Sequence, residues 1–137
     1  MITEDYVSFE VAKLLKDKGF DEHCFCINYP LPGVGHHSII LPNFLNNSMI
    51  PFIDEYKFCR YKEDFITIPT LQMAMKWLRE IYQIDIQVFR HIRGKRITFY
   101  ARIEQNTHLE HQDKCNLYQS YEQDCEAAIK YCLEHLI

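Results

Sequence analysis

The fold is decided by residues 84–104, IDIQVFRHIRGKRITFYARIE, in which apolar and polar side chains alternate on both sides of a Gly-Lys pair. Alternation with a period of two is typical of a half-buried β-strand, and Gly94-Lys95 has the length of a two-residue hairpin loop. We therefore predict a β-hairpin with strands at 84–92 and 96–104. In this register one face is apolar, through the opposed pairs Ile92–Ile97, Val88–Ala101 and Ile86–Ile103.

Two opposed pairs interrupt this pattern. Arg90 stands opposite Phe99 on the apolar face, and Asp85 stands opposite Glu104, which places like charges together. We expect an early strand end or a β-bulge at these positions.

Three other segments carry apolar residues at helical spacing, each after a residue that can cap a helix N-terminus. The predicted helices are residues 9–18, 71–82 and 121–136, with Ser8, Thr70 and Ser120 as their N-caps. Gly19 and Phe20 are placed to end the first helix in a Schellman motif. Ser120 and Gln123 form a capping box for the third.

The remaining segments predict shorter elements. We expect a strand at 23–29, then a long irregular connection through 30–51 with one short strand at 38–41. One or two strands are expected within 55–68. Residues 105–119 read as a loop, with a short strand near Leu117-Tyr118. This order predicts one α+β domain over 1–137, an antiparallel sheet built on the central hairpin and packed by the three helices.

The composition excludes several classes of protein. The chain has 137 residues, 47% of them hydrophobic and 14% aromatic, which is typical of a globular domain rather than a disordered chain. The formal net charge is −4, so no global field attracts nucleic acid or an anionic membrane.

Localisation follows from what the sequence lacks. No apolar run approaches the roughly 20 residues that span a bilayer, and the N-terminal residues do not have the pattern of a signal peptide. We expect a cytoplasmic protein that does not enter membranes and whose six cysteines are free thiols.

Catalytic and metal-binding patterns are weak. The sequence has no nucleophile elbow, no HExxH and no phosphate-binding glycine-rich loop, so we expect no enzyme and no cofactor. The spacing of His108, His111 and Cys115 makes them weak candidates for metal ligands, but closed zinc sites show tighter paired ligands. Surface histidines and buried thiols are the interpretation that we prefer.

The outer face of the hairpin carries the most chemistry. Phe89 and Tyr100 stand opposite each other there, and their neighbours are mostly basic: His91, Arg93, Lys95, Arg96, Thr98 and Arg102. Single-strand nucleic-acid binders combine stacking aromatic side chains with cations on an open sheet. The alternative is structural, because aromatic cross-strand pairs also stabilise sheets and basic loops are commonly only solvated.

Three stretches carry a resemblance to a known family. They are 7–20 (VSFEVAKLLKDKGF), 69–80 (PTLQMAMKWLRE) and 121–136 (YEQDCEAAIKYCLEHL). In this order they resemble a family of small uncharacterised proteins of bacterial prophages and mobile elements. The resemblance leaves out residues 30–60 and 105–119. It implies a phage-like origin and supplies no catalytic residue.

The sequence leaves three functions open, of which a metal-stabilised or cysteine-dependent activity is the third. The first is a non-enzymatic accessory protein of phage or mobile-element type that binds a protein partner, with a homodimer as one form of that interaction. The alternative is single-stranded nucleic-acid binding through the basic and aromatic face of the hairpin, which the acidic net charge disfavours.

Overall fold

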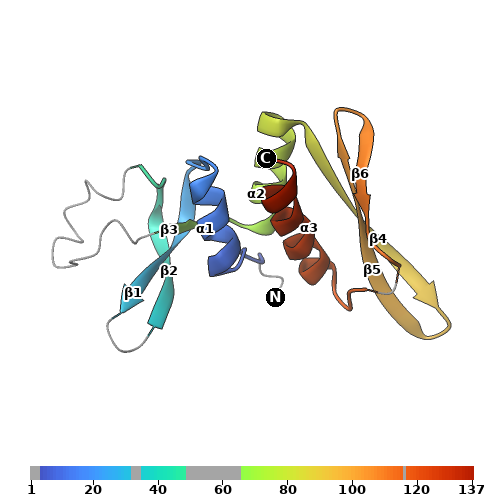
Figure 1. The fold of residues 1–137 in the computed structure, drawn as a ribbon. Helices are drawn as coiled ribbons and strands as arrows, with labels where there is room; N and C mark the ends of the chain where they lie inside the picture. Colours follow the sequence, from blue (N-terminus) through green and yellow to red (C-terminus); the bar gives the residue numbers. More distant parts are fainter. Residues whose placement is uncertain (1–3, 32–34, 49–65, 116) are drawn as a thin grey trace. The chain divides into compact units, whose positions relative to one another are not determined.

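The computed structural model describes residues 4–31, 35–48, 66–115 and 117–137 (Figure 1). These residues form three helices and two antiparallel sheets, which confirms the α+β class. They fall into two compact units, one within residues 6–69 and the other within residues 1–5 and 70–137. Two compact units can still belong to one domain that folds as a whole, so the single domain over 1–137 stays a prediction.

Helix α1, Phe9–Asp17, opens the first unit and ends as the sequence predicts. The side chain of Ser8 accepts a hydrogen bond from the amide of Val11 at 3.2 Å. At the C-terminus Phe20 N–H donates to Leu15 O and Gly19 N–H donates to Lys16 O, with Gly19 at φ +92°. These two bonds make up the Schellman motif, which turns the chain toward the first sheet.

The first unit also holds a sheet of order β2-β1-β3. Its strands are β1, Cys24–Leu31, β2, Gly35–Leu45, and β3, Ile66–Ile68, all antiparallel. The expectation of an irregular connection with one short strand at 38–41 is wrong, because β2 is 11 residues long. Backbone pairing with β1 outweighs the local preference of its turn-forming residues. Residues 55–65 of the predicted strand region lie outside the described residues.

The second unit begins with helix α2, Leu71–Tyr82. Thr70 caps it by accepting a hydrogen bond from the amide of Met73 at 3.1 Å. Its buried side chains are Leu71, Ala74, Met75, Trp77 and Leu78. Ile81, near the end of the helix, is 58% exposed. Gln83 ends the helix in the left-handed region, at φ 56°.

The hairpin is confirmed in register. Strand β4, Ile84–Arg93, pairs with β5, Arg96–Gln105, and Ile86, Val88 and Ile92 oppose Ile103, Ala101 and Ile97 as predicted. The expected interruption is wrong, since the pairing runs unshifted from Ile84 to Arg93. Gly94 takes φ +64°, the positive value that a type II′ turn requires at its first loop residue.

A third strand, β6, His108–Gln112, was not expected, since 105–119 reads as a loop. It pairs with β5 and gives the order β4-β5-β6. Asn106 and Thr107 make the connecting turn with φ values of 52° and 71°. The five residues of β6 are too few and too polar to show alternation, so pairing with β5 decides their conformation.

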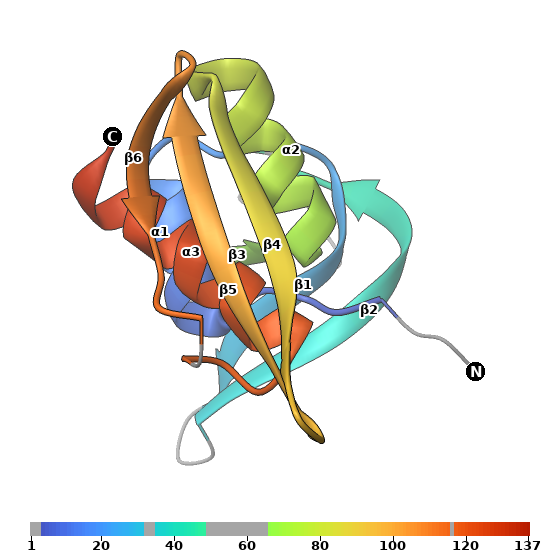
Figure 2. The ribbon, with the colours of Figure 1, turned by 90° about the vertical axis from the view of Figure 1, so that its right-hand side faces the viewer.

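Helix α3, Tyr121–His135, completes the unit and is capped by Ser120, which accepts a hydrogen bond from the amide of Gln123 at 3.1 Å. Helices α2 and α3 cover one face of the sheet β4-β5-β6, and neither covers the other face (Figures 1 and 2). Leu78, Ile84, Ala101, Ile103 and Ile129 are fully buried there. Helix α1, predicted to pack on the same sheet, contacts β3 of the first unit. Within the described residues, no helix is long and apolar enough to cross a membrane.

Candidate functional site

The outer face of the hairpin is the first candidate site. We define it as the side chains that alternate with the fully buried Ile84, Ala101 and Ile103 and therefore point away from α2 and α3. They are Asp85, Gln87, Phe89, His91 and Arg93 of β4, with Arg96, Thr98, Tyr100, Arg102 and Glu104 of β5. Figure 2 shows this face of the sheet toward the viewer, with α2 and α3 behind it.

An aromatic pair lies at the centre of the outer face. Phe89 and Tyr100 are directly opposed, their ring centroids are 5.2 Å apart and their planes differ by 23°. Phe89 is 38% exposed, while Tyr100 is half-buried. The strand pairing holds the rings together, and their stacked arrangement leaves a flat apolar surface open on one side.

Basic side chains gather at the loop end of the hairpin. Arg90, Arg93, Lys95 and Arg96 are exposed, and residues 89–98 contain no acidic side chain. Arg93 and Arg96 oppose each other directly, which is an unfavourable cross-strand pair. None of the four cations makes an ion pair with a residue in the described part of the chain.

The other end of the outer face is acidic. Asp85 opposes Glu104, and Arg102, a predicted binding residue, is held by Glu104, with Nε 2.9 Å from Oε1. Oδ2 of Asp85 accepts a hydrogen bond from the side-chain amide of Gln87 at 3.0 Å. The structure therefore separates Arg102 from the other predicted cations, because its charge is already compensated.

One neighbour of the aromatic pair is not available. Thr98 was expected on the open face, but it is 3% exposed and donates its hydroxyl to the carbonyl oxygen of Cys115 at 2.6 Å. The chain between β6 and α3 passes close to β5 here, and the amide of Phe99 donates to Tyr118 O. His91 is half-buried opposite Thr98. The accessible part of the predicted site is thus Phe89, Tyr100, Arg93, Lys95 and Arg96.

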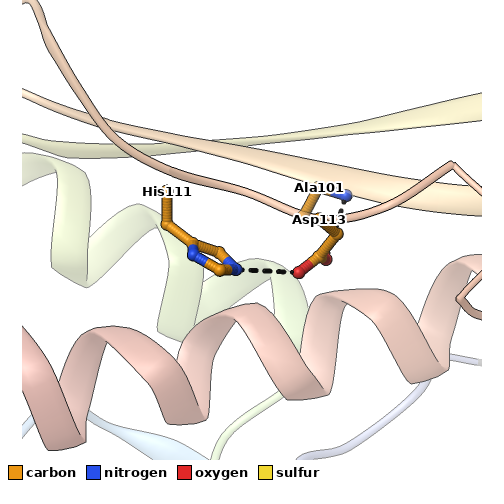
Figure 3. Close-up of polar contacts among 3 residues, drawn as sticks. All are labelled: Ala101, His111 and Asp113. Carbon is orange, nitrogen blue, oxygen red and sulfur yellow. Dashed lines mark hydrogen bonds and ion pairs between the residues drawn. The ribbon is translucent and has the colours of Figure 1, made fainter.

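A second cluster joins β5, β6 and the segment that follows it, and sequence reasoning missed it. Figure 3 shows Asp113 between two partners: its Oδ1 lies 2.9 Å from Nε2 of His111, and its Oδ2 accepts the amide of Ala101 at 3.2 Å. The amide of Asp113 in turn donates to Ala101 O. Through its backbone amide and its carboxylate, Asp113 therefore extends the hydrogen bonding with β5 beyond the end of β6.

Helix α3 closes this cluster with a second carboxyl group. Asp124 is 0% exposed, and burial raises its pKa to about 8, with a further contribution from the neighbouring carboxyl group of Asp113. Neither carboxyl oxygen of Asp124 has a hydrogen-bond partner among the described residues. Asp124 therefore favours its neutral, protonated form.

Aromatic rings complete the surroundings. The ring of His111 stacks on Tyr131 of α3 with centroids 4.2 Å apart, and Tyr131 contacts His135 at 4.6 Å. Burial raises the pKa of Tyr118, and Asp113 and Asp124 add to the effect. A paired carboxyl group beside a histidine is a pattern of acid–base sites. Here, however, Asp124 is enclosed and both oxygens of Asp113 are occupied, so the cluster fits a structural role.

The weak metal candidates are not assembled. His111 faces Asp113 and Tyr131, while His108 and Cys115 are exposed. In the parts of the chain that the structure describes, no group of three His, Cys, Asp or Glu side chains is placed to hold a metal ion.

The buried cysteines are poor nucleophiles. Burial raises the pKa of Cys24 and of Cys125 to about 11, and that of Cys132 to about 12. Thiolates are the reactive form, and these thiols stay protonated at neutral pH. Their role is packing.

Comparison with protein-family models, with curated proteins and with solved structures gives no significant match.

Proposed function

We propose that this chain is a non-enzymatic accessory protein, of the phage or mobile-element type that its sequence resembles, and that it binds a protein partner through the hairpin β4–β5. The observation that carries the proposal is the stacked Phe89–Tyr100 pair on a face that α2 and α3 leave open. Aromatic residues and arginines are the side chains enriched at the centres of protein interfaces.

Exposed aliphatic side chains favour a protein over nucleic acid. Ile92 is 55% exposed and Ile97 is 47% exposed, and they oppose each other beside the basic loop, on the opposite face of the hairpin from Phe89 and Tyr100. Branched aliphatic side chains cannot stack on bases as rings do, but they bury well against another protein. The exposed cations of the loop fit a partner with acidic side chains around an apolar centre.

Affinity capture tests this proposal. Tagged protein is incubated with lysate of its own host, with and without nuclease, and retained proteins are identified by mass spectrometry. We expect one protein to be enriched and to survive nuclease treatment. It should be lost from the double variant Phe89→Ala/Tyr100→Ala, because that variant removes the apolar centre of the surface.

A matched control lies on the same sheet. Leu109 of β6 is 52% exposed but lies outside the basic segment, so Leu109→Ala should retain the captured protein. Circular dichroism confirms that each variant is folded. Capture that is equal for both variants would place the binding surface elsewhere.

Single-stranded nucleic acid is the second candidate, favoured by the same stack beside the exposed arginines at the loop. Stacking on such a pair contributes about 1–3 kcal/mol per base, and phosphate contacts make the affinity fall with salt. Fluorescence anisotropy with labelled oligo-dT and oligo-U tests it at two salt concentrations. Binding that weakens with salt and disappears in Phe89→Ala/Tyr100→Ala would favour this candidate over the first.

A further inference from the structure

Strand β4 lies at one end of the sheet β4-β5-β6 and pairs on one side only among the described strands. In a hairpin with a two-residue loop, the two residues that flank the loop exchange both backbone hydrogen bonds; here they are Arg93 and Arg96. Along the two strands, hydrogen-bonded pairs then alternate with pairs that are not hydrogen-bonded. Odd-numbered residues of β4 therefore bond to β5. The even-numbered residues from Ile84 to Ile92 direct N–H and C=O toward the open edge, where another strand can pair.

The charges of β4 are arranged for pairing with a copy of itself. Near its N-terminal end β4 carries Asp85, which opposes the like charge of Glu104 in the same hairpin. At its C-terminal end β4 carries Arg93, which opposes Arg96. Glu104 is paired with Arg102, whereas neither Asp85 nor Arg93 has an ion pair among the described residues, so each would be stabilised by an opposite charge. An antiparallel second copy of β4 brings the basic end of one strand beside the acidic end of the other.

We infer that the protein forms a two-fold dimer in which the open edges of two β4 strands pair antiparallel, centred on Phe89. Asp85 then lies opposite Arg93 of the second copy, and Phe89 meets Phe89 of the second copy on the axis. On the opposite face Ile92, 55% exposed in one copy, comes beside Ile86 of the other. The two sheets become one of six strands.

The register is specified by hydrogen bonding as well as by charge. The pairs Ile86–Ile92 and Val88–Arg90 are made of even-numbered residues, so their free N–H and C=O groups meet across the axis. Pairs of odd-numbered residues, Asp85–Arg93 among them, fall at the non-hydrogen-bonded positions, where side chains approach most closely. A shift by one residue would place outer-face side chains against the helix-covered face and is excluded. The dimer is held by the backbone edge of β4, and its pairs Asp85–Arg93 and Phe89–Phe89 lie on the same outer face as the partner site proposed above.

Charge reversal in the full-length protein tests the inference. Size-exclusion chromatography with light scattering should give a dimer for the unmodified protein. Asp85→Arg and Arg93→Asp should each raise the monomer–dimer Kd about tenfold, because both symmetry-related pairs become repulsive. The double variant Asp85→Arg/Arg93→Asp should restore the dimer. Glu110→Arg, on β6 at the other edge of the sheet, is the matched control and should leave the Kd unchanged.

A thiol placed on the axis gives a second, independent readout. With Cys59 and Cys115 replaced by Ser, Phe89→Cys should form an intermolecular disulfide under mild oxidation, because opposed Cα atoms at such a position are about 4.5 Å apart. Gln87→Cys, displaced from the axis, should not. A monomeric mass at millimolar concentration would overturn the inference. A dimer that neither single reversal weakens, or that the double reversal does not restore, would overturn the register and with it the proposal.

Discussion

At the scale of single residues, Asp124 is the side chain whose environment differs most from what its position in the sequence suggests. An aspartate in the first turn of a helix normally faces solvent and interacts with the helix dipole. Asp124 instead belongs to the buried stripe of α3, which Ala128 and Cys132 continue along the helix. Burial and the neighbouring Asp113 raise its pKa to about 8 from the ordinary value of 3.8.

This shift predicts how stability depends on pH. The folded state holds a proton that the unfolded chain releases near pH 4, so the contribution is complete below that pH and is lost as the pH rises toward 8. One such group changes the free energy of unfolding by up to about 1.4 kcal/mol per pH unit. Asp124→Asn stays neutral and should remove this slope, so that its stability relative to the unmodified protein rises between pH 5 and pH 9.

Urea unfolding at pH 5, 7 and 9 measures the effect. Glu122→Gln is the control, because Glu122 is an exposed acid in the same helical turn. An Asp124→Asn variant with the same pH dependence as the unmodified protein would show that Asp124 is ionised in the folded state.

At the scale of elements, the hairpin depends on its loop. Gly94 has φ +64°, and a Cβ atom built there meets nothing within 4 Å. The cost of Gly94→Ala is therefore conformational alone and should be about 1 kcal/mol of unfolding free energy. Gly94→Asn should cost less, because asparagine enters the left-handed region more readily. Equal stability of both variants and the unmodified protein in urea unfolding would contradict the type II′ geometry.

The β6 strand is an element that exists only through its partners. Asp113 anchors its end by bonds to both backbone groups of Ala101 and to His111. The ring of His111 rests on Tyr131 of α3. These contacts join residues far apart in sequence, so no local pattern within 105–119 predicts them.

At the scale of the whole molecule, the two compact units raise the question of cooperativity. Each is shorter than about 75 residues, a length at which one core alone supplies little stability. We therefore expect one unfolding transition. The single Trp, Trp77, reports on the second unit by fluorescence, and far-ultraviolet circular dichroism reports on both. Coincident midpoints in urea are expected, and separated midpoints would show that the units unfold as two domains.

Local signals in the sequence determined the three helices, their N-caps, the Schellman motif at Gly19 and the register of the hairpin. The reason is that caps, helical periodicity and two-residue loops act over a few neighbouring residues. The side chains of the outer face follow directly from that register, so Phe89, Tyr100, Arg93 and Arg96 could be predicted together.

Only the tertiary structure decided which surfaces stay open and which polar groups are buried. The division into two sheets, the length of β2 and the existence of β6 depend on strand pairing across the chain. The burial of Thr98 and Asp124 depends on the course of the chain between β6 and α3. These contacts are between residues separated in sequence, and their energies arise only when the pieces are packed together, which composition and periodicity do not record.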